Sequence, residues 1–286
     1  GETLTLDYLV KAFKDMGLKP GFGDSYLQAV PLAQISADQN MQLDIGGLKF
    51  ANGSEFTART QRIAETVSLN KSDVVFVGYG INAPEYGWND YQGLDVKGKT
   101  VIVLVNDPGF ATQDPAVFKG NAMTYYGRWT YKYEEAARQG AEAVFIVHET
   151  APAAYGWGVV QNSNTGTKFT LVDANNNQGQ VGVMGWVQHE TAQKIFTKAG
   201  LDFDTLKQQA AKPNFKAIPL KLSAQLTLNN KIERAESHNV AALLPGKTRP
   251  DEVVMMHAHW DHLGTVIEDG KSEILNGAVD NASGVA

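Results

Sequence analysis

The chain contains no cysteine among its 286 residues, which excludes disulfide bridges and thiolate metal ligands. It also lacks a long hydrophobic run, because stretches such as Val101–Val105 fall far short of the roughly 20 residues that a membrane-spanning helix needs. Basic residues are not in excess, since 25 Lys and Arg stand against 31 Asp and Glu and the net charge is −6. These absences argue against a membrane span and against nucleic acid as a partner.

The remaining composition is that of an ordinary globular protein, with 43% hydrophobic and 20% charged residues, and the length is enough for two domains. In the middle of the chain the spacing predicts a strand over Val101–Val105, a helix over Trp129–Gln139 and a strand over Ala143–Val147. This strand–helix–strand order predicts an α/β core.

Three further segments give clear patterns. Residues 4–13 have helical spacing, and hydrophobic and polar residues alternate over 218–228, as in a half-buried strand. Residues 151–180 are rich in Asn, Gly, Gln and Thr, which predicts an irregular loop.

The stretch 257–284 is the most informative part of the chain. Three of the six histidines fall within 257–262, and the apolar run Val253–Met256 before them predicts a buried strand that carries His259 and Asp261 at its carboxyl end. Asp280 follows in a loop of small residues. Imidazole and carboxylate groups at a strand end suit zinc, because both are common zinc ligands.

Two other motifs have weaker support. Residues 78–83 fit a dinucleotide-binding fingerprint, but Pro84 and Gly87 interrupt the helix that would hold the pyrophosphate. Ser283 lacks the Gly-x-Ser-x-Gly elbow of serine hydrolases, so a serine nucleophile is unsupported.

The residues His259-Trp260-Asp261 and the run Gly277-Ala278-Val279-Asp280-Asn281-Ala282-Ser283-Gly284 resemble the signature of the co-catalytic dizinc exopeptidases. That clan includes bacterial leucyl aminopeptidases, plasma glutamate carboxypeptidase and glutamate carboxypeptidase II. The resemblance implies that His259 binds one of two zinc ions and that Asp280 bridges both. Asp261 would orient the His259 ring, as carboxylates commonly do behind a metal-bound histidine. His257 is expected to be packed or to support a ligand from behind. His262 could line the site, but a structural role is favoured.

The middle of the chain resembles a protease-associated (PA) domain inserted into such a peptidase, on the residues Val77–Gly80, Lys97–Lys99 and Val101–Val105. The resemblance implies an α/β fold made of a partial zinc-exopeptidase sheet domain with an inserted, β-rich α/β PA domain. The expected division is 1–70 for the first part of the peptidase domain, 71–230 for the PA domain, and 231–286 for the start of the metal-bearing part. The PA domain would contribute protein contacts.

The function implied by this resemblance is a zinc-dependent exopeptidase, an aminopeptidase that releases N-terminal residues from peptides with a hydroxide shared by two zinc ions. The further ligands and the glutamate base of that family are not found, so the chain resembles a piece cut short at its C-terminus and is expected to be inactive alone. Alternatives on the same fold are a non-catalytic receptor or scaffold, a carboxypeptidase and a glutaminyl cyclase. Family analogy places the protein in a bacterial periplasm or outside the cell.

Overall fold

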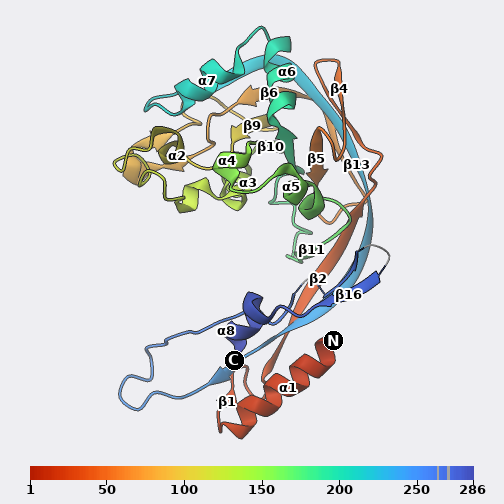
Figure 1. The fold of residues 1–286 in the computed structure, drawn as a ribbon, viewed down its shortest axis with the longest axis vertical. Coiled ribbons are helices and arrows are strands. Elements are labelled where there is room, and N and C mark those ends of the chain that lie inside the picture. Colours follow the sequence, from red (N-terminus) through yellow and green to blue (C-terminus); the bar gives the residue numbers. More distant parts are fainter. Residues whose placement is uncertain (263, 269–270) are drawn as a thin grey trace. The chain divides into compact units, whose positions relative to one another are not determined.

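The structure, a computed structural model, describes residues 1–262, 264–268 and 271–286. It divides into two compact units, shown as ribbons in Figure 1. Unit 1 consists of Gly1–Val30 with Glu236–Ala286, and unit 2 of Pro31–Ala235. Residues 31–70 therefore belong to unit 2, and the three-part division 1–70, 71–230 and 231–286 stays a prediction, as does the inserted PA domain.

Helices in the described residues are mostly short. They are α1 (Glu2–Asp15), α2 (Pro108–Thr112), α3 (Trp129–Arg138), α4 (Thr150–Ala153), α5 (Trp157–Asn164), α6 (His189–Lys198), α7 (Phe203–Ala210) and α8 (Ser283–Val285). Short helical turns lie at Pro84–Tyr86, Tyr125–Gly127 and Ala278–Ala282. None of these helices is both long and apolar enough to cross a membrane.

Strands make up most of the remaining regular structure. They are β1 (Lys19–Pro20), β2 (Leu27–Ala37), β3 (Gln42–Ile45), β4 (Leu48–Ala51), β5 (Phe56–Arg59), β6 (Thr66–Phe76), β7 (Asn82–Ala83), β8 (Trp88–Asn89), β9 (Thr100–Leu104), β10 (Ala143–His148), β11 (Thr167–Leu171), β12 (Val183–Gln188), β13 (Ile218–Val240), β14 (Ala242–Leu243), β15 (Gly264–Glu268) and β16 (Lys271–Leu275). The predicted α/β class is confirmed, because unit 2 combines a large mixed sheet with helices on its faces.

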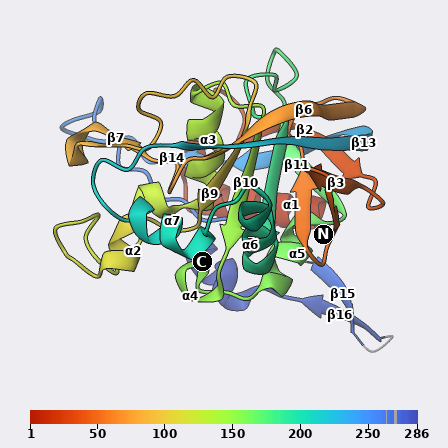
Figure 2. The same ribbon diagram turned by 90° about the horizontal axis from the view of Figure 1, so that it is seen from above.

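That sheet has the order β11-β2-β13-β6-β9-β10-β12-β5 across the described residues, with β3 and β4 attached beside β13. Its centre is parallel: β9 pairs in parallel with both β6 and β10, and β10 with β12. Its outer pairings, β6 with β13 and β12 with β5, are antiparallel. Figure 2 shows β6 and β13 running side by side in a second view.

The central strand β9 explains how the core of unit 2 is built. Successive side chains point to opposite faces of a strand, so Ile102 and Leu104 join one hydrophobic core and Val101 and Val103 the other. All residues of β9 are buried, as expected for a strand in a sheet covered on both faces. Burying each such aliphatic side chain stabilises the fold by about 1.5–3 kcal/mol.

Helices cover both faces of this sheet (Figure 1). Residues of α6 and α7, such as Phe196 and Leu206, join the core of Ile102, and Tyr133 of α3 and Val160 of α5 join the core of Val103. The prediction of a helix over 129–139 is confirmed. The loop predicted over 151–180 is wrong in part, because α5 and β11 form there: Val160 supplies a buried contact, and β11 pairs with β2.

Unit 1 is less regular. Its first segment is α1, which buries Leu6 and Leu9, and β1 pairs with β14. The strands β15 and β16 form a hairpin. The strand predicted over Val253–Met256 is wrong: the run is in no strand of the described residues, and its side chains are 73–92% exposed. Apolar residues favour a strand only when a neighbouring strand pairs with their backbone, and this run has no such neighbour in the described part of the chain.

Candidate metal centre

The structure brings together the two residues that the sequence predicts as metal ligands. The Nε2 atom of His259 lies 2.9 Å from Oδ1 of Asp280, although the residues are far apart in the chain. Both side chains are accessible, with 49% of the histidine and 74% of the aspartate exposed. The imidazole nitrogen of His259 and the carboxylate oxygen of Asp280 face each other, and both types of atom are common zinc ligands.

Asp261 lies on the other side of the His259 ring. Its backbone carbonyl oxygen is 2.9 Å from Nδ1 of His259, and its Oδ1 is 3.5 Å from the same nitrogen. The carbonyl, more than the carboxylate, therefore orients the ring in this structure. Hydrogen bonds to the Asp261 carbonyl and the Asp280 carboxylate raise the pKa of His259. A metal ion bound at Nε2 would take the place of a proton there.

The loop that presents Asp280 depends on a glycine. Gly277 has φ +62°, a left-handed conformation that glycine adopts without strain. A Cβ atom at this position would lie 2.7 Å from the Asp280 carbonyl oxygen and 2.7 Å from Cγ of His262. The Gly277 carbonyl accepts a hydrogen bond from the Ala282 amide, and the Ser283 hydroxyl donates to the Val279 carbonyl. These contacts form the turn that holds Asp280.

The segment that carries His259 is anchored by its neighbour. The Trp260 indole Nε1 donates a hydrogen bond to the His238 carbonyl oxygen of β13 at 3.2 Å. His238 itself lies 3.6 Å from the Glu2 carboxylate of α1. The hydrogen bond of Trp260 therefore ties the segment that carries His259 to His238.

The other histidines of the motif differ in their surroundings. His262 packs against Gly277, in line with a structural role. His257 is exposed, because the strand expected to pack it is absent. No group of three His, Asp or Glu residues suited to a metal ion occurs within the described part of the chain. His259 and Asp280 therefore supply two donors of a site, and their role as ligands stays a prediction.

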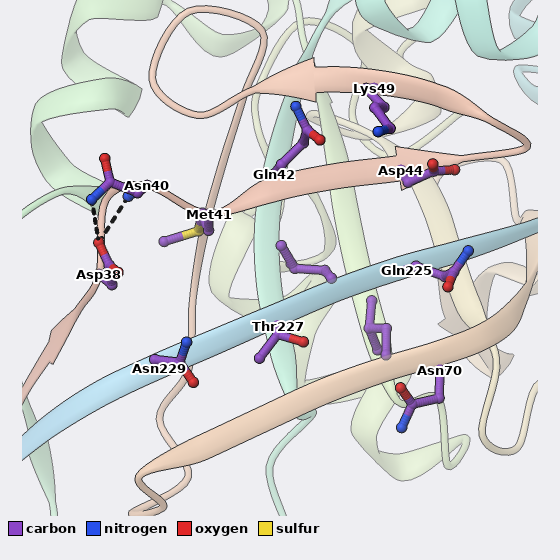
Figure 3. A pocket seen from close by; sticks show the side chains of 12 residues that line it. Asp38, Asn40, Met41, Gln42, Asp44, Lys49, Asn70, Gln225, Thr227 and Asn229 are labelled. Atoms are coloured by element: carbon purple, nitrogen blue, oxygen red, sulfur yellow. Dashed lines mark hydrogen bonds between the residues drawn. The ribbon is translucent and has the colours of Figure 1, made fainter.

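A second candidate site is a groove in unit 2 with a volume of about 420 Å³. Figure 3 shows that it opens where β3 separates from β13. The groove is lined mainly by exposed polar side chains over a floor of Met41, Leu69 and Leu226. Asp38 is already engaged, because its Oδ1 accepts from the Asn40 backbone and side-chain amides at 2.9 and 3.0 Å. The lining residues include no histidine, so this groove does not offer the metal chemistry of the 259–280 motif.

Unit 2 also contains a buried charged cluster that the sequence analysis did not predict. The fully buried Lys132 of α3 donates to the carbonyl oxygens of Tyr79 and Asn106 at 2.6 and 2.8 Å. Burial lowers the pKa of Lys132 to about 7. Asp90 accepts from the Tyr79 and Ile81 amides and the Trp88 indole, and burial raises its pKa to about 7. In the sequence, the flanking residues Tyr131 and Tyr133 were the feature that could have indicated that Lys132 is buried.

Comparison with known proteins adds a local match. Residues 239–286 match Peptidase family M28, and this segment contains both His259 and Asp280. The match covers a minor part of the chain. A search of curated proteins finds no match.

Solved structures of two aminopeptidases are similar over almost the whole chain. An aminopeptidase from Aneurinibacillus sp. strain AM-1 has 19% identity and a TM-score of 0.44, over 99% of this chain and 51% of that one. BSAP, a zinc aminopeptidase from Bacillus subtilis, has 14% identity and a TM-score of 0.34, over 99% of this chain and 49% of that one. The chain thus spans about half the length of the solved structures it matches.

Proposed function

We propose that residues 239–286 carry part of the metal centre of a zinc-dependent exopeptidase, an aminopeptidase that acts on peptides with a free N-terminus. The observation that carries the proposal is the 2.9 Å approach of His259 Nε2 to Asp280 Oδ1. It is supported by the local match of this segment to Peptidase family M28. The dizinc form, the export of the protein and a PA domain in the middle of the chain belong to the same proposal.

In this proposal His259 and Asp280 would hold the metal, and the Asp261 carbonyl and carboxylate face the other ring nitrogen of His259. Keeping a proton on Nδ1 leaves the Nε2 lone pair available, because a neutral imidazole has one donor and one acceptor nitrogen. Zinc supplies Lewis acidity, which lowers the pKa of a coordinated water to about 7 and polarises a carbonyl group. As a carboxylate, Asp280 would have a second oxygen available if two ions were bound.

The test compares two conservative variants of the full-length protein. Asp280→Asn removes the carboxylate and keeps its shape, and Asp251→Asn makes the same change at an exposed aspartate outside the motif. We expect Asp280→Asn to lose bound zinc, measured by atomic absorption, together with hydrolysis of aminoacyl anilides. Asp251→Asn is expected to keep both.

Other outcomes would change the assignment in distinct ways. Unchanged zinc content and turnover in Asp280→Asn would refute the role of this residue. A wild-type protein without zinc and without activity would favour a receptor or scaffold. Cleavage of N-terminally blocked peptides from their C-terminus would indicate a carboxypeptidase, and cyclisation of N-terminal glutamine a glutaminyl cyclase.

A further inference from the structure

The loop before Asp280 contains a chemically reactive pair of residues. The chain has two Asn-Gly dipeptides, Asn52-Gly53 and Asn276-Gly277. In such a pair the backbone nitrogen of the glycine can attack the side-chain amide carbon of the asparagine. Glycine favours this attack because it has no side chain to shield its nitrogen and its backbone adopts many conformations.

The surroundings of Asn276 leave it open to this reaction. The residue is exposed and lies outside the helices and strands, between β16 and the turn that begins at Ala278. Its side-chain amide donates one long bond, to the Ile274 carbonyl at 3.4 Å. The Gly277 amide makes no hydrogen bond within the described residues. Both reacting groups are therefore free to approach each other.

The pair Asn52-Gly53 is a natural control with the same chemistry. The Asn52 side-chain amide donates to both the backbone carbonyl and the side-chain oxygen of Gln39, each at 3.1 Å. The Gly53 amide donates to the Phe56 carbonyl at 2.7 Å. The attack at Asn52 would first have to break these bonds.

The glycine at position 277 cannot be exchanged for a less reactive residue. Its φ is positive, and a Cβ atom there would lie only 2.7 Å from atoms of both Asp280 and His262, so any side chain would clash. The turn that presents Asp280 thus requires the residue that makes Asn276 reactive.

We propose that Asn276 is a self-modification site that deamidates through a succinimide. The Gly277 nitrogen bonds to Cγ of Asn276 and loses its proton, and the Cγ–Nδ2 bond breaks with release of ammonia. Water then opens the ring at either carbonyl and leaves aspartate or isoaspartate at position 276. No oxidant, reductant or enzyme takes part.

The consequence for the loop follows from its contacts. Isoaspartate adds a methylene group to the backbone one residue before Gly277. The Gly277 carbonyl accepts a hydrogen bond from the Ala282 amide, and the His262 side chain lies 2.7 Å from where a Cβ atom of residue 277 would be. The turn that sets Asp280 opposite His259 is then disturbed, and the segment gains a negative charge. Loss of metal binding through this change rests on the proposed function, whereas the modification itself rests on the loop alone.

The experiment follows both asparagines in one protein. The purified full-length protein is incubated in a mildly alkaline buffer, and peptide mapping by mass spectrometry measures the conversion of –NH2 to –OH at each position. Methylation by protein isoaspartyl methyltransferase identifies isoaspartate. We expect Asn276 to convert roughly tenfold or more faster than Asn52, because each hydrogen bond that restrains Asn52-Gly53 adds to the barrier. Conversion at Asn52 as fast as at Asn276, or none at Asn276, would overturn the proposal.

A matched variant separates the modification from its consequence. Asn276→Gln keeps the amide but lengthens the side chain, so the five-membered ring cannot form and the mass change at position 276 should disappear. Aged wild-type protein should lose zinc binding in a titration, whereas equally aged Asn276→Gln keeps it. If fresh wild-type protein binds no zinc, the proposed function fails, and the rates at the two asparagines still decide the proposal on Asn276.

Discussion

Two apolar runs of four residues, one in each unit, differ sharply in their exposure to solvent. Val101–Leu104 in unit 2 is 0–2% exposed, whereas Val253–Met256 in unit 1 is 73–92% exposed. The first run lies in β9, which pairs in parallel with β6 and β10. The second belongs to no strand of the described residues.

The difference shows that side-chain hydrophobicity alone does not make a strand. A central strand of a parallel sheet has a backbone partner on each edge, and helices cover both faces of the sheet. β9 has all of these in unit 2. The 253–256 run has the side chains of a central strand without the pairing, so its apolar surface is exposed and forms an aggregation hazard.

The largest expected effect comes from truncating the core of unit 2. Phe145 of β10 is fully buried, and Phe145→Ala should lower the free energy of unfolding by about 3–5 kcal/mol. Met256→Ala should change it by no more than about 0.5 kcal/mol, because Met256 is 92% exposed. Urea unfolding followed by circular dichroism measures both.

Ile102→Val is a milder variant if Phe145→Ala does not fold, with an expected cost of about 0.5–1.5 kcal/mol. If Met256→Ala cost as much stability as Phe145→Ala, the 253–256 run would have to be packed in solution, contrary to its exposure here.

A medium effect is expected at Lys132, where unit 2 buries a charge. Its pKa of about 7 in the folded protein lies below the value of about 10.4 in an unfolded chain. Between these values the unfolded state binds more protons, so Lys132 makes the protein more stable as the pH rises. Lys132→Met leaves the carbonyls of Tyr79 and Asn106 without their donor, at a cost of about 1–3 kcal/mol.

The Lys132→Met variant should therefore lose more stability, relative to wild type, at about pH 9 than at about pH 7. Urea unfolding at both values measures the difference. Lys194→Met is the control, because Lys194 pairs with Glu55 at the surface and its side chain is 57% exposed. An equal loss at the two pH values would show that Lys132 keeps its proton when buried.

The smallest expected effect is at Trp260, whose indole donates a hydrogen bond to the carbonyl of His238, a residue of the same unit. Trp260→Phe removes one hydrogen bond, worth about 0.5–1.5 kcal/mol, and keeps an aromatic ring. We expect faster deuterium uptake in peptides covering 257–262 and unchanged uptake in β9. Unchanged uptake in both would mean that this bond does not hold the segment.

The sequence predicted secondary structure correctly where the hydrophobic periodicity of a segment agrees with its packing. It predicted the helix over α3, the strands β9 and β10 and the alternation in β13, because each has a regular pattern and a partner in unit 2. It failed for Val253–Met256, where the apolar pattern is present but the described residues provide no strand that pairs with it. It also missed α5, because this helix is rich in polar residues and Val160 is the residue of it that is buried, so the segment has no clear hydrophobic periodicity.

The sequence named residues for the candidate site, whose role as metal ligands stays a prediction, but it did not give the contacts between them. The motif pointed to His259 and Asp280, which lie within hydrogen-bond distance. No pattern of residue types could show that the carbonyl of Asp261 is closer to the ring than its carboxylate, because that depends on the local backbone. The hydrogen-bond partners of Lys132 could not be read from residue types either, because they are backbone carbonyls.

The position of Trp260 in unit 1, beside His259, makes it useful for fluorescence spectroscopy. Of the five tryptophans, Trp260 is the one in unit 1, while Trp88, Trp129, Trp157 and Trp186 are all in unit 2. The difference between the emission spectra of wild type and Trp260→Phe therefore isolates a single fluorophore next to His259. That fluorophore gives the protein a built-in optical reporter of its candidate metal centre, without any attached dye.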